Sequence, residues 1–128
     1  MTEPVLDHDV IAREIVDSAF SVHTALGPGL LESVYEQCLA HELRCRNLTV
    51  VRQVALPVVY RDVSIDAGFR LDLLVNELVV VEIKAAERLM PIHEAQLLTY
   101  LKLSGKRLGL LINFNTVRIK DGIRRLIM

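Results

Sequence analysis

Tryptophan is absent from this 128-residue chain, and its aromatic residues are only three tyrosines and three phenylalanines. A buried core must therefore consist mainly of leucine, valine and isoleucine. Four prolines and a hydrophobic fraction of 52% argue against disorder. No apolar run approaches the ~18 residues that a membrane-spanning helix needs, so we expect no membrane partner. We predict one domain over residues 1–128, large enough to bury about two thirds of its unfolded surface.

A basic segment followed by an apolar one is also lacking at residues 1–4, which read Met-Thr-Glu-Pro. We therefore expect no signal peptide and a cytoplasmic protein. The only cysteines, Cys38 and Cys45, agree, because seven helical residues separate them by about 10 Å, too far for a disulfide. His41 shares their helical face, which leaves zinc binding open. Two buried thiols and a boundary histidine are the simpler interpretation, because zinc ligands usually come from separate elements.

The net charge of −1 hides an uneven distribution. Residues 1–83 contain six Lys/Arg and thirteen Asp/Glu (6 − 13 = −7), whereas residues 84–128 contain nine and three (9 − 3 = +6). This asymmetry indicates either a positive face that binds a polyanion or an ordinary solvated surface. The basic residues in question include Lys102, Lys106, Arg107, Arg118, Lys120, Arg124 and Arg125.

Hydrophobic periodicity predicts an α/β domain with the order α-α-β-β-β-α-β-β. Asp7 or Asp9 can cap the first helix, and the run Gly27-Pro28-Gly29 ends it. Pro57 places part of the first strand at an edge or an irregular point. The valines at 79–81 are apolar on both faces and predict a central strand. The expected helices are 8–26, 30–46 and 92–104; the expected strands are 50–60, 64–75, 78–84 and 108–114, followed by one or two edge strands within 117–128.

Residues 69–84 are the most informative stretch, because two apolar strands carry Asp72, Glu82 and Lys84. Burying a charge costs several kcal/mol unless the charge is paired or binds a metal. Glu82 and Lys84 share one strand face. A two-residue loop at Asn76-Glu77 would put Asp72 on the other face, so a shared site requires a connection with an odd number of residues, or a β-bulge.

With that register, Asp72 and Glu82 supply the hard oxygen ligands that suit Mg²⁺ or Mn²⁺. Such an ion activates water and stabilises charge on a phosphoryl oxygen. Lys84 could position or deprotonate that water, or stabilise the transition state. The alternative is an exposed Glu-Lys pair that contributes little.

Further polar residues recur at helical spacing near this site. Gln96 and Tyr100 are four apart, so they share a helix face, and both carry groups suited to a phosphate or a metal-bound water. Glu32 could complement the start of its helix or reach the site as another carboxylate. Proton transfer is open to His23 and His93, but a structural role fits each better.

The run Gly29-Leu30-Leu31-Glu32-Ser33-Val34-Tyr35 resembles the Gly-x-x-Glu-x-x-Tyr signature of the GxxExxY family. Segments 72–75, 82–84, 93–101 and 110–114 resemble that family in the same order. The resemblance implies membership of the PD-(D/E)XK nuclease superfamily, whose restriction-endonuclease-like core is a mixed central sheet flanked by helices. It places Asp72, Glu82 and Lys84 at the motif positions. It also matches Glu32 to the first-helix acid and Gln96 and Tyr100 to a Gln-x-x-x-Tyr pattern. Leu71 stands where the superfamily often has proline.

The leading hypothesis is a Mg²⁺- or Mn²⁺-dependent phosphodiesterase with Asp72, Glu82 and Glu32 as metal ligands. Together with these three acids, the catalytic residues would include Lys84, Gln96 and Tyr100. Nucleic acid is the expected substrate, with DNA favoured over RNA. Two alternatives remain: a nucleic-acid-binding module without turnover, and an interaction protein that works through its edge strands, for which a homodimer is one arrangement.

Overall fold

A computed structural model describes residues 7–128. These residues form three α-helices, a five-stranded sheet and a separate two-stranded sheet. Residues 1–4, on which the expectation about a signal peptide rests, lie outside the described part. The elements are α1 (His8–Leu26), α2 (Glu32–Cys45), β1 (Val50–Ala55), β2 (Val58–Tyr60), β3 (Val63–Ile65), β4 (Arg70–Val75), β5 (Val79–Lys84), α3 (Pro91–Ser104), β6 (Leu108–Asn113), the 3₁₀ helix η1 (Ile119–Gly122) and β7 (Ile123–Ile127).

The large sheet has the strand order β1-β4-β5-β6-β7. Only β5 and β6 pair in parallel, and the other neighbours are antiparallel. The sheet is therefore mixed, and with its helices it follows the predicted order α-α-β-β-β-α-β-β, into which the β2–β3 hairpin is inserted. Strand β5 lies at the centre, as the valines at 79–81 predicted, and those three residues are fully buried.

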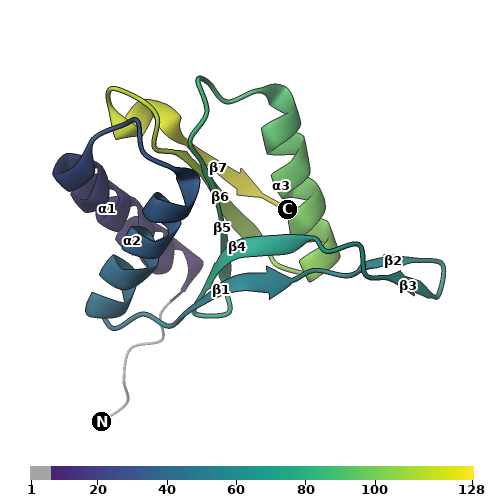
Figure 1. The fold of residues 1–128 in the computed structure, drawn as a ribbon. Coiled ribbons are helices and arrows are strands. Elements are labelled where there is room, and N and C mark those ends of the chain that lie inside the picture. Colours follow the sequence, from purple (N-terminus) through teal and green to yellow (C-terminus); the bar gives the residue numbers. More distant parts are fainter. Residues whose placement is uncertain (1–6) are drawn as a thin grey trace, which may run out of the picture.

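Helices cover both faces of this sheet, with α1 and α2 on one side and α3 on the other (Figure 1). Each face has its own hydrophobic core. The larger core joins α1 and α2 to sheet residues such as Leu73, Val81 and Ile83. The smaller one joins α3 to the opposite face, where the hydrogen-only side chain of Gly109 lets Leu97 pack closely, since a Cβ there would lie 3.0 Å from it. A site on the central strands can thus be approached by residues from both layers.

Two predicted strands are broken in the structure, which corrects the expectation of continuous strands at 50–60 and 64–75. Leu56 and Pro57 separate β1 from β2, and residues 66–69 separate β3 from β4. Proline cannot donate to a ladder, and Gly68 adopts a left-handed φ of 80° while its N–H donates to the Asp66 carboxylate. The resulting β2–β3 hairpin projects away from the body as an arm (Figure 1).

The remaining boundaries shift by only a few residues. Asp7 caps α1, since the N–H of Val10 donates to its carboxylate at 2.9 Å, and Gly27 ends that helix with φ 72°. The predicted edge strands of the tail reduce to one, β7, because residues 119–122 form a 3₁₀ turn. Within residues 7–128, no helix has the length and apolar character that crossing a bilayer would require.

Candidate functional site

The connection between β4 and β5 satisfies the register condition. Val75 pairs with Val79, so Asn76, Glu77 and Leu78 form a three-residue connection. Asn76 and Glu77 have left-handed φ values of 50° and 58°, and the N–H of Leu78 donates to the Val75 carbonyl at 3.0 Å. The tight turn thus occupies Asn76-Glu77, and Leu78 is the extra residue. Continued along the strands, this register brings Asp72 opposite Glu82.

At that level the two carboxylates take the place of ladder hydrogen bonds. The N–H of Asp72 donates to Glu82 Oε1 at 3.2 Å, and the N–H of Ile83 donates to Asp72 Oδ2 at 2.8 Å. Each acid therefore accepts from the backbone of the opposite strand. Alternation in β4 also breaks here, because Leu71 and Leu74 both pack in the α3 core whereas Leu73 packs in the other core. This break in alternation and the odd connection together position the pair.

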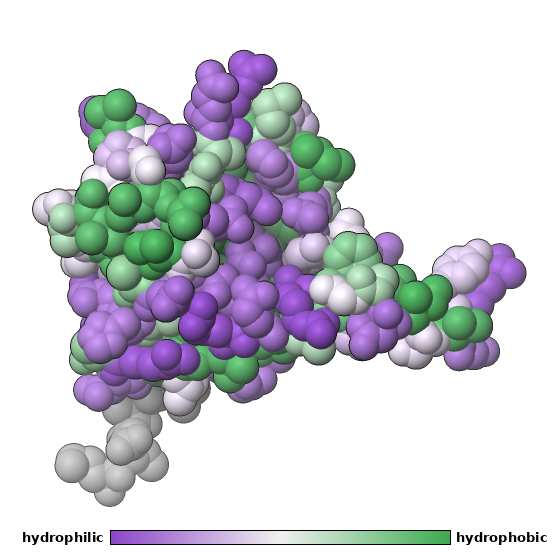
Figure 2. All heavy atoms as spheres, viewed as in Figure 1, coloured by the Kyte–Doolittle hydropathy of each residue, from purple (hydrophilic) through white to green (hydrophobic). Residues whose placement is uncertain are grey.

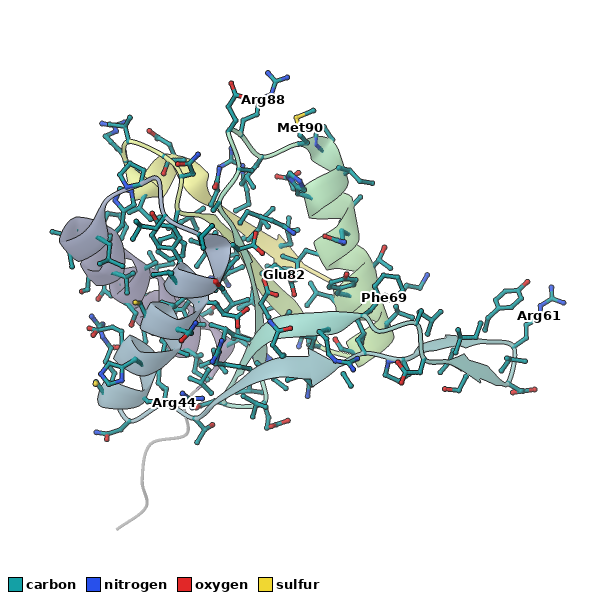
Figure 3. All side chains as sticks on the ribbon, in the orientation of Figure 1. Arg44, Arg61, Phe69, Glu82, Arg88 and Met90 are labelled. Carbon is teal, nitrogen blue, oxygen red and sulfur yellow. The ribbon has the colours of Figure 1, made fainter. Side chains whose placement is uncertain are left out.

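Burial and like charge act together on Glu82. Its side chain is only 4% exposed, and in Figure 3 it lies between α2 and α3, next to β4. Burial, reinforced by the neighbouring Asp72 carboxylate, raises the pKa of Glu82 to about 9. Without a counter-ion, Glu82 is therefore protonated at neutral pH. Such a pair of facing acids favours either a shared proton or a bound cation.

Lys84 completes the sequence motif on the same face as Glu82. Its positive charge lowers the pKa of Glu32 and of Glu82, which opposes the effect of their burial. Asn113, fully buried in β6, holds the chain just beyond Lys84, because its side-chain amide bonds both the N–H and the carbonyl of Ala86 at 3.0 and 2.9 Å. This clamp orients the end of β5 from which Lys84 projects.

The Gly-x-x-Glu-x-x-Tyr run has a clear structural basis. The ring of Tyr35 is fully buried and stacks on Phe114, with centroids 4.7 Å apart. Its hydroxyl donates to the Gly27 carbonyl at 2.6 Å and accepts from the N–H of Leu30 at 3.0 Å, so it ties the α1–α2 loop together. Gly29 in that loop has a φ of 101°, which favours glycine. The loop sets where α2 begins.

That position brings Glu32, the first residue of α2, into the electrostatic neighbourhood of the strand acids. Burial raises the pKa of the Glu32 carboxyl, the Asp72 charge raises it further, and Lys84 opposes the shift. The charges of Asp72 and Lys84 therefore act on Glu32, and its assignment to the site stays a prediction. Glu32 is also the acidic residue in the first turn of α2, where it complements the start of the helix.

Helix α3 contributes Tyr100 from the opposite layer. Burial raises the pKa of its hydroxyl, and the charges of Glu82 and Asp72 raise it further. Gln96 stands one turn earlier and shares a surface hollow with Tyr100 and Phe69. The Asp72 charge thus acts on Glu32, Glu82 and Tyr100, and the Lys84 charge acts on Glu32 and Glu82, whereas Gln96 is linked to this group only through the hollow that it shares with Tyr100.

Two residues that the sequence analysis did not single out adjoin this group. Glu36, one turn after Glu32, is buried and accepts bonds from Arg52 at 2.9 and 3.1 Å and from Gln53 at 2.7 Å. Gln53 interrupts the β1–β4 ladder at the level of Asp72 with a left-handed φ of 54°. Strained backbone of this kind concentrates at functional sites. The spacing of Glu32 and Glu36 was the available signal; nothing in the sequence indicated the bend at Gln53.

The other candidates have structural roles. His23 contacts the Thr116 carbonyl at 2.8 Å, and His93 accepts from the N–H of Met90 at 2.9 Å at the start of α3. Both cysteines are free thiols, but the expectation that both are buried is wrong, because Cys38 is half-buried and Cys45 is exposed. No group of three or more His, Cys, Asp or Glu residues suited to a metal occurs within residues 7–128. Of the basic residues, Arg118, Arg124 and Arg125 pair with Asp121, Glu94 and Asp9.

These observations test whether a divalent cation suits the site. Asp72 and Glu82 provide hard oxygen atoms, and a half-buried acid facing a buried one leaves a charge that a cation would neutralise. Glu32 is not grouped tightly enough with them to form a three-acid cluster in the described residues. Magnesium commonly binds one or two carboxylates and keeps several waters, so the two-acid arrangement fits it.

Comparison with known proteins adds one finding. A family model described as "PD-(D/E)XK nuclease superfamily" matches residues 9–126, nearly the whole chain. No curated protein matches, and no solved structure matches.

Proposed function

Because this chain belongs to the PD-(D/E)XK nuclease superfamily, we propose that it is a metal-dependent nuclease that hydrolyses phosphodiester bonds. The observation that carries this proposal is the reciprocal contact of Asp72 and Glu82 across β4 and β5, with Lys84 on the same face of β5 as Glu82. A structural ion pair would not need a buried acid facing a half-buried one, an arrangement that destabilises the fold in the absence of a cation.

Asp72 and Glu82 would hold Mg²⁺ or Mn²⁺, with Glu32 reaching the ion through a water. When bound, the ion lowers the pKa of a coordinated water and stabilises charge on a phosphoryl oxygen. Lys84 orients the attacking water or stabilises the negative charge that develops on the phosphate. Water adds to phosphorus, and the bond from phosphorus to one ester oxygen breaks.

Tyr100 and Gln96 complete the catalytic group from α3. The charges of Glu82 and Asp72 act on the Tyr100 hydroxyl, and its raised pKa keeps it a hydrogen-bond donor through the physiological range. Gln96, one turn earlier, would bind the substrate through the donor and the acceptor of its side-chain amide. Hydrophilic residues occupy the centre of this face, where Glu82 lies in the same view (Figure 2). DNA remains the favoured substrate, and the GxxExxY assignment, the single domain over 1–128 and the cytoplasmic location remain predictions.

The decisive experiment is cleavage of single-stranded, double-stranded and branched DNA, and of RNA, with Mg²⁺ or Mn²⁺. We expect Lys84→Ala to lower the rate by roughly 10²–10³-fold, the cost of removing one preorganised charge-stabilising group. Arg13→Ala, at an exposed basic residue of α1, is the matched control and should leave the rate unchanged. Equal rates in wild type and Lys84→Ala would contradict the proposal. Salt-dependent binding without cleavage would favour the non-catalytic module.

Metal binding is tested separately by thermal unfolding. Mn²⁺ at 100 times its dissociation constant should stabilise the fold by about 2.7 kcal/mol. Asp72→Asn should abolish that shift, whereas Asp62→Asn, in the exposed turn of the arm, should retain it. An undiminished shift in Asp72→Asn would show that the ion binds elsewhere.

A further inference from the structure

A shallow hollow borders the candidate site on the α3 side. Its volume is about 310 Å³, and it is lined by Phe69, Ile92, Ala95, Gln96, Thr99 and Tyr100. None of these residues carries a formal charge at neutral pH. We propose that this hollow binds a nucleobase of the substrate, next to the phosphate at the carboxylates; this rests on the proposed nuclease function.

Continuity with the acids is the first argument. Tyr100 lines the hollow, and the charges of Glu82 and Asp72 act on its hydroxyl. Phe69 lies three residues before Asp72, just ahead of β4, and in Figure 3 its side chain lies beside α3, on the side of Glu82 away from α2. A nucleotide with its phosphate at the acids would therefore have this hollow within reach of its base.

The chemistry of the lining is the second argument. The rings of Phe69 and Tyr100 lie 6.2 Å apart and are tilted by 57°, and 43% of Phe69 is exposed. An exposed aromatic ring offers a stacking surface to any base. The Gln96 amide carries both a donor and an acceptor, which suits a base edge. An uncharged lining suits a neutral heterocycle and would not attract a phosphate.

Size argues against a second copy of the chain as the occupant. A stable protein interface uses about 20–30 residues a side, whereas six residues line this hollow. Its volume lies at the lower end of small-ligand pockets. A base stacked inside a duplex reaches such a pocket only if it is extruded, at a cost of a few kcal/mol. The substrate class is therefore single-stranded nucleic acid, or a duplex end whose bases are unpaired.

The test measures binding of a short single strand that carries one 2-aminopurine, without a divalent metal so that cleavage is not required. We expect the wild type to quench the probe, and Phe69→Ala to weaken binding by roughly tenfold or more, as loss of one stacked base predicts. Phe69→Leu keeps an apolar side chain and should weaken binding similarly. Phe20→Ala, at a phenylalanine of α1 that is 41% exposed, should have no effect.

The inference is overturned by equal strand binding by wild type and Phe69→Ala, or by equal binding of intact and abasic strands by the wild type. A dimer that Phe69→Ala dissociates without changing strand binding also overturns it, because a second copy would then cover the hollow. Base binding without cleavage would refute the nuclease proposal but not the base pocket. Equal cleavage of intact and abasic strands would refute only the base pocket.

Discussion

The two hairpins of this molecule depart from ordinary residue burial in opposite directions. The β4–β5 hairpin is central and buried, yet it carries Asp72, Glu82 and Lys84. The β2–β3 arm is exposed, yet its strands carry Val59, Tyr60, Val63 and Ile65 on the surface. Both are joined by turns whose two left-handed residues are not glycine. Hydrophobicity therefore does not explain either hairpin by itself.

The comparison shows that one hairpin contributes both burial and the candidate site, whereas the other contributes neither. In β4–β5 every apolar residue packs in one of two cores, and the acids replace ladder bonds, so chemistry is obtained at a cost in stability. In the arm, apolar side chains face solvent, and Arg61 lies over the Tyr60 ring at 5.5 Å. The arm contributes little burial, and its removal from the fold would leave both cores intact.

The largest contrast should come from shortening each turn by one residue. Deleting Leu78 would convert the three-residue connection into two, shift the register by one and move Val79, Val81 and Ile83 out of their core. We expect loss of most of the ~5–15 kcal/mol that stabilises a domain, seen as the absence of a cooperative thermal transition. Deleting Asp62 from the arm should leave that transition in place. Comparable loss of the thermal transition in both deletion variants would show that the arm also stabilises the fold.

A smaller effect, of a few kcal/mol, concerns Glu82 and pH. Its carboxyl binds a proton more tightly when folded, because its pKa rises from 4.5 to about 9. Its contribution to stability is therefore full below about pH 4.5 and is lost as pH rises through about 9. Without metal, Glu82→Gln should become more stable relative to wild type across that range, measured by denaturant unfolding at several pH values. Glu77→Gln, in the exposed turn, should follow the wild-type profile; parallel profiles for all three proteins would contradict the prediction.

The smallest contrast uses the same substitution in both hairpins. Val81 is fully buried and Val59 is 60% exposed. Val81→Ala should cost roughly 2 kcal/mol, from lost burial and a residual cavity. Val59→Ala should stay within about 0.5 kcal/mol, as surface changes usually do. Chemical denaturation measures both. A cost at Val59 close to that at Val81 would mean that the arm packs against something in solution.

Most of the fold followed from local patterns. Helix periodicity placed α1 between Asp7 and Gly27, and the apolar valines placed β5 at the centre, because burial on both faces leaves no polar alternation. The division of the long strands was less accessible. Pro57 indicated an irregular point. Strands β2 and β3 form an exposed arm because the helices do not cover them, and only tertiary packing decides which residues the helices cover.

The site divides in the same way. The types and spacing of Asp72, Glu82 and Lys84, and their resemblance to a nuclease motif, were determined by the sequence alone, because side-chain alternation and the cost of buried charge are local properties. Only the tertiary structure decided that Leu78 is the extra residue, that side-chain alternation in β4 breaks near Asp72 and that Glu32 and Tyr100 approach from opposite layers. Shifting the β4–β5 pairing by one residue changes the local free energy of the hairpin little. The choice is made by the long-range packing of Val79, Val81 and Ile83 against α1 and α2, which no single segment contains.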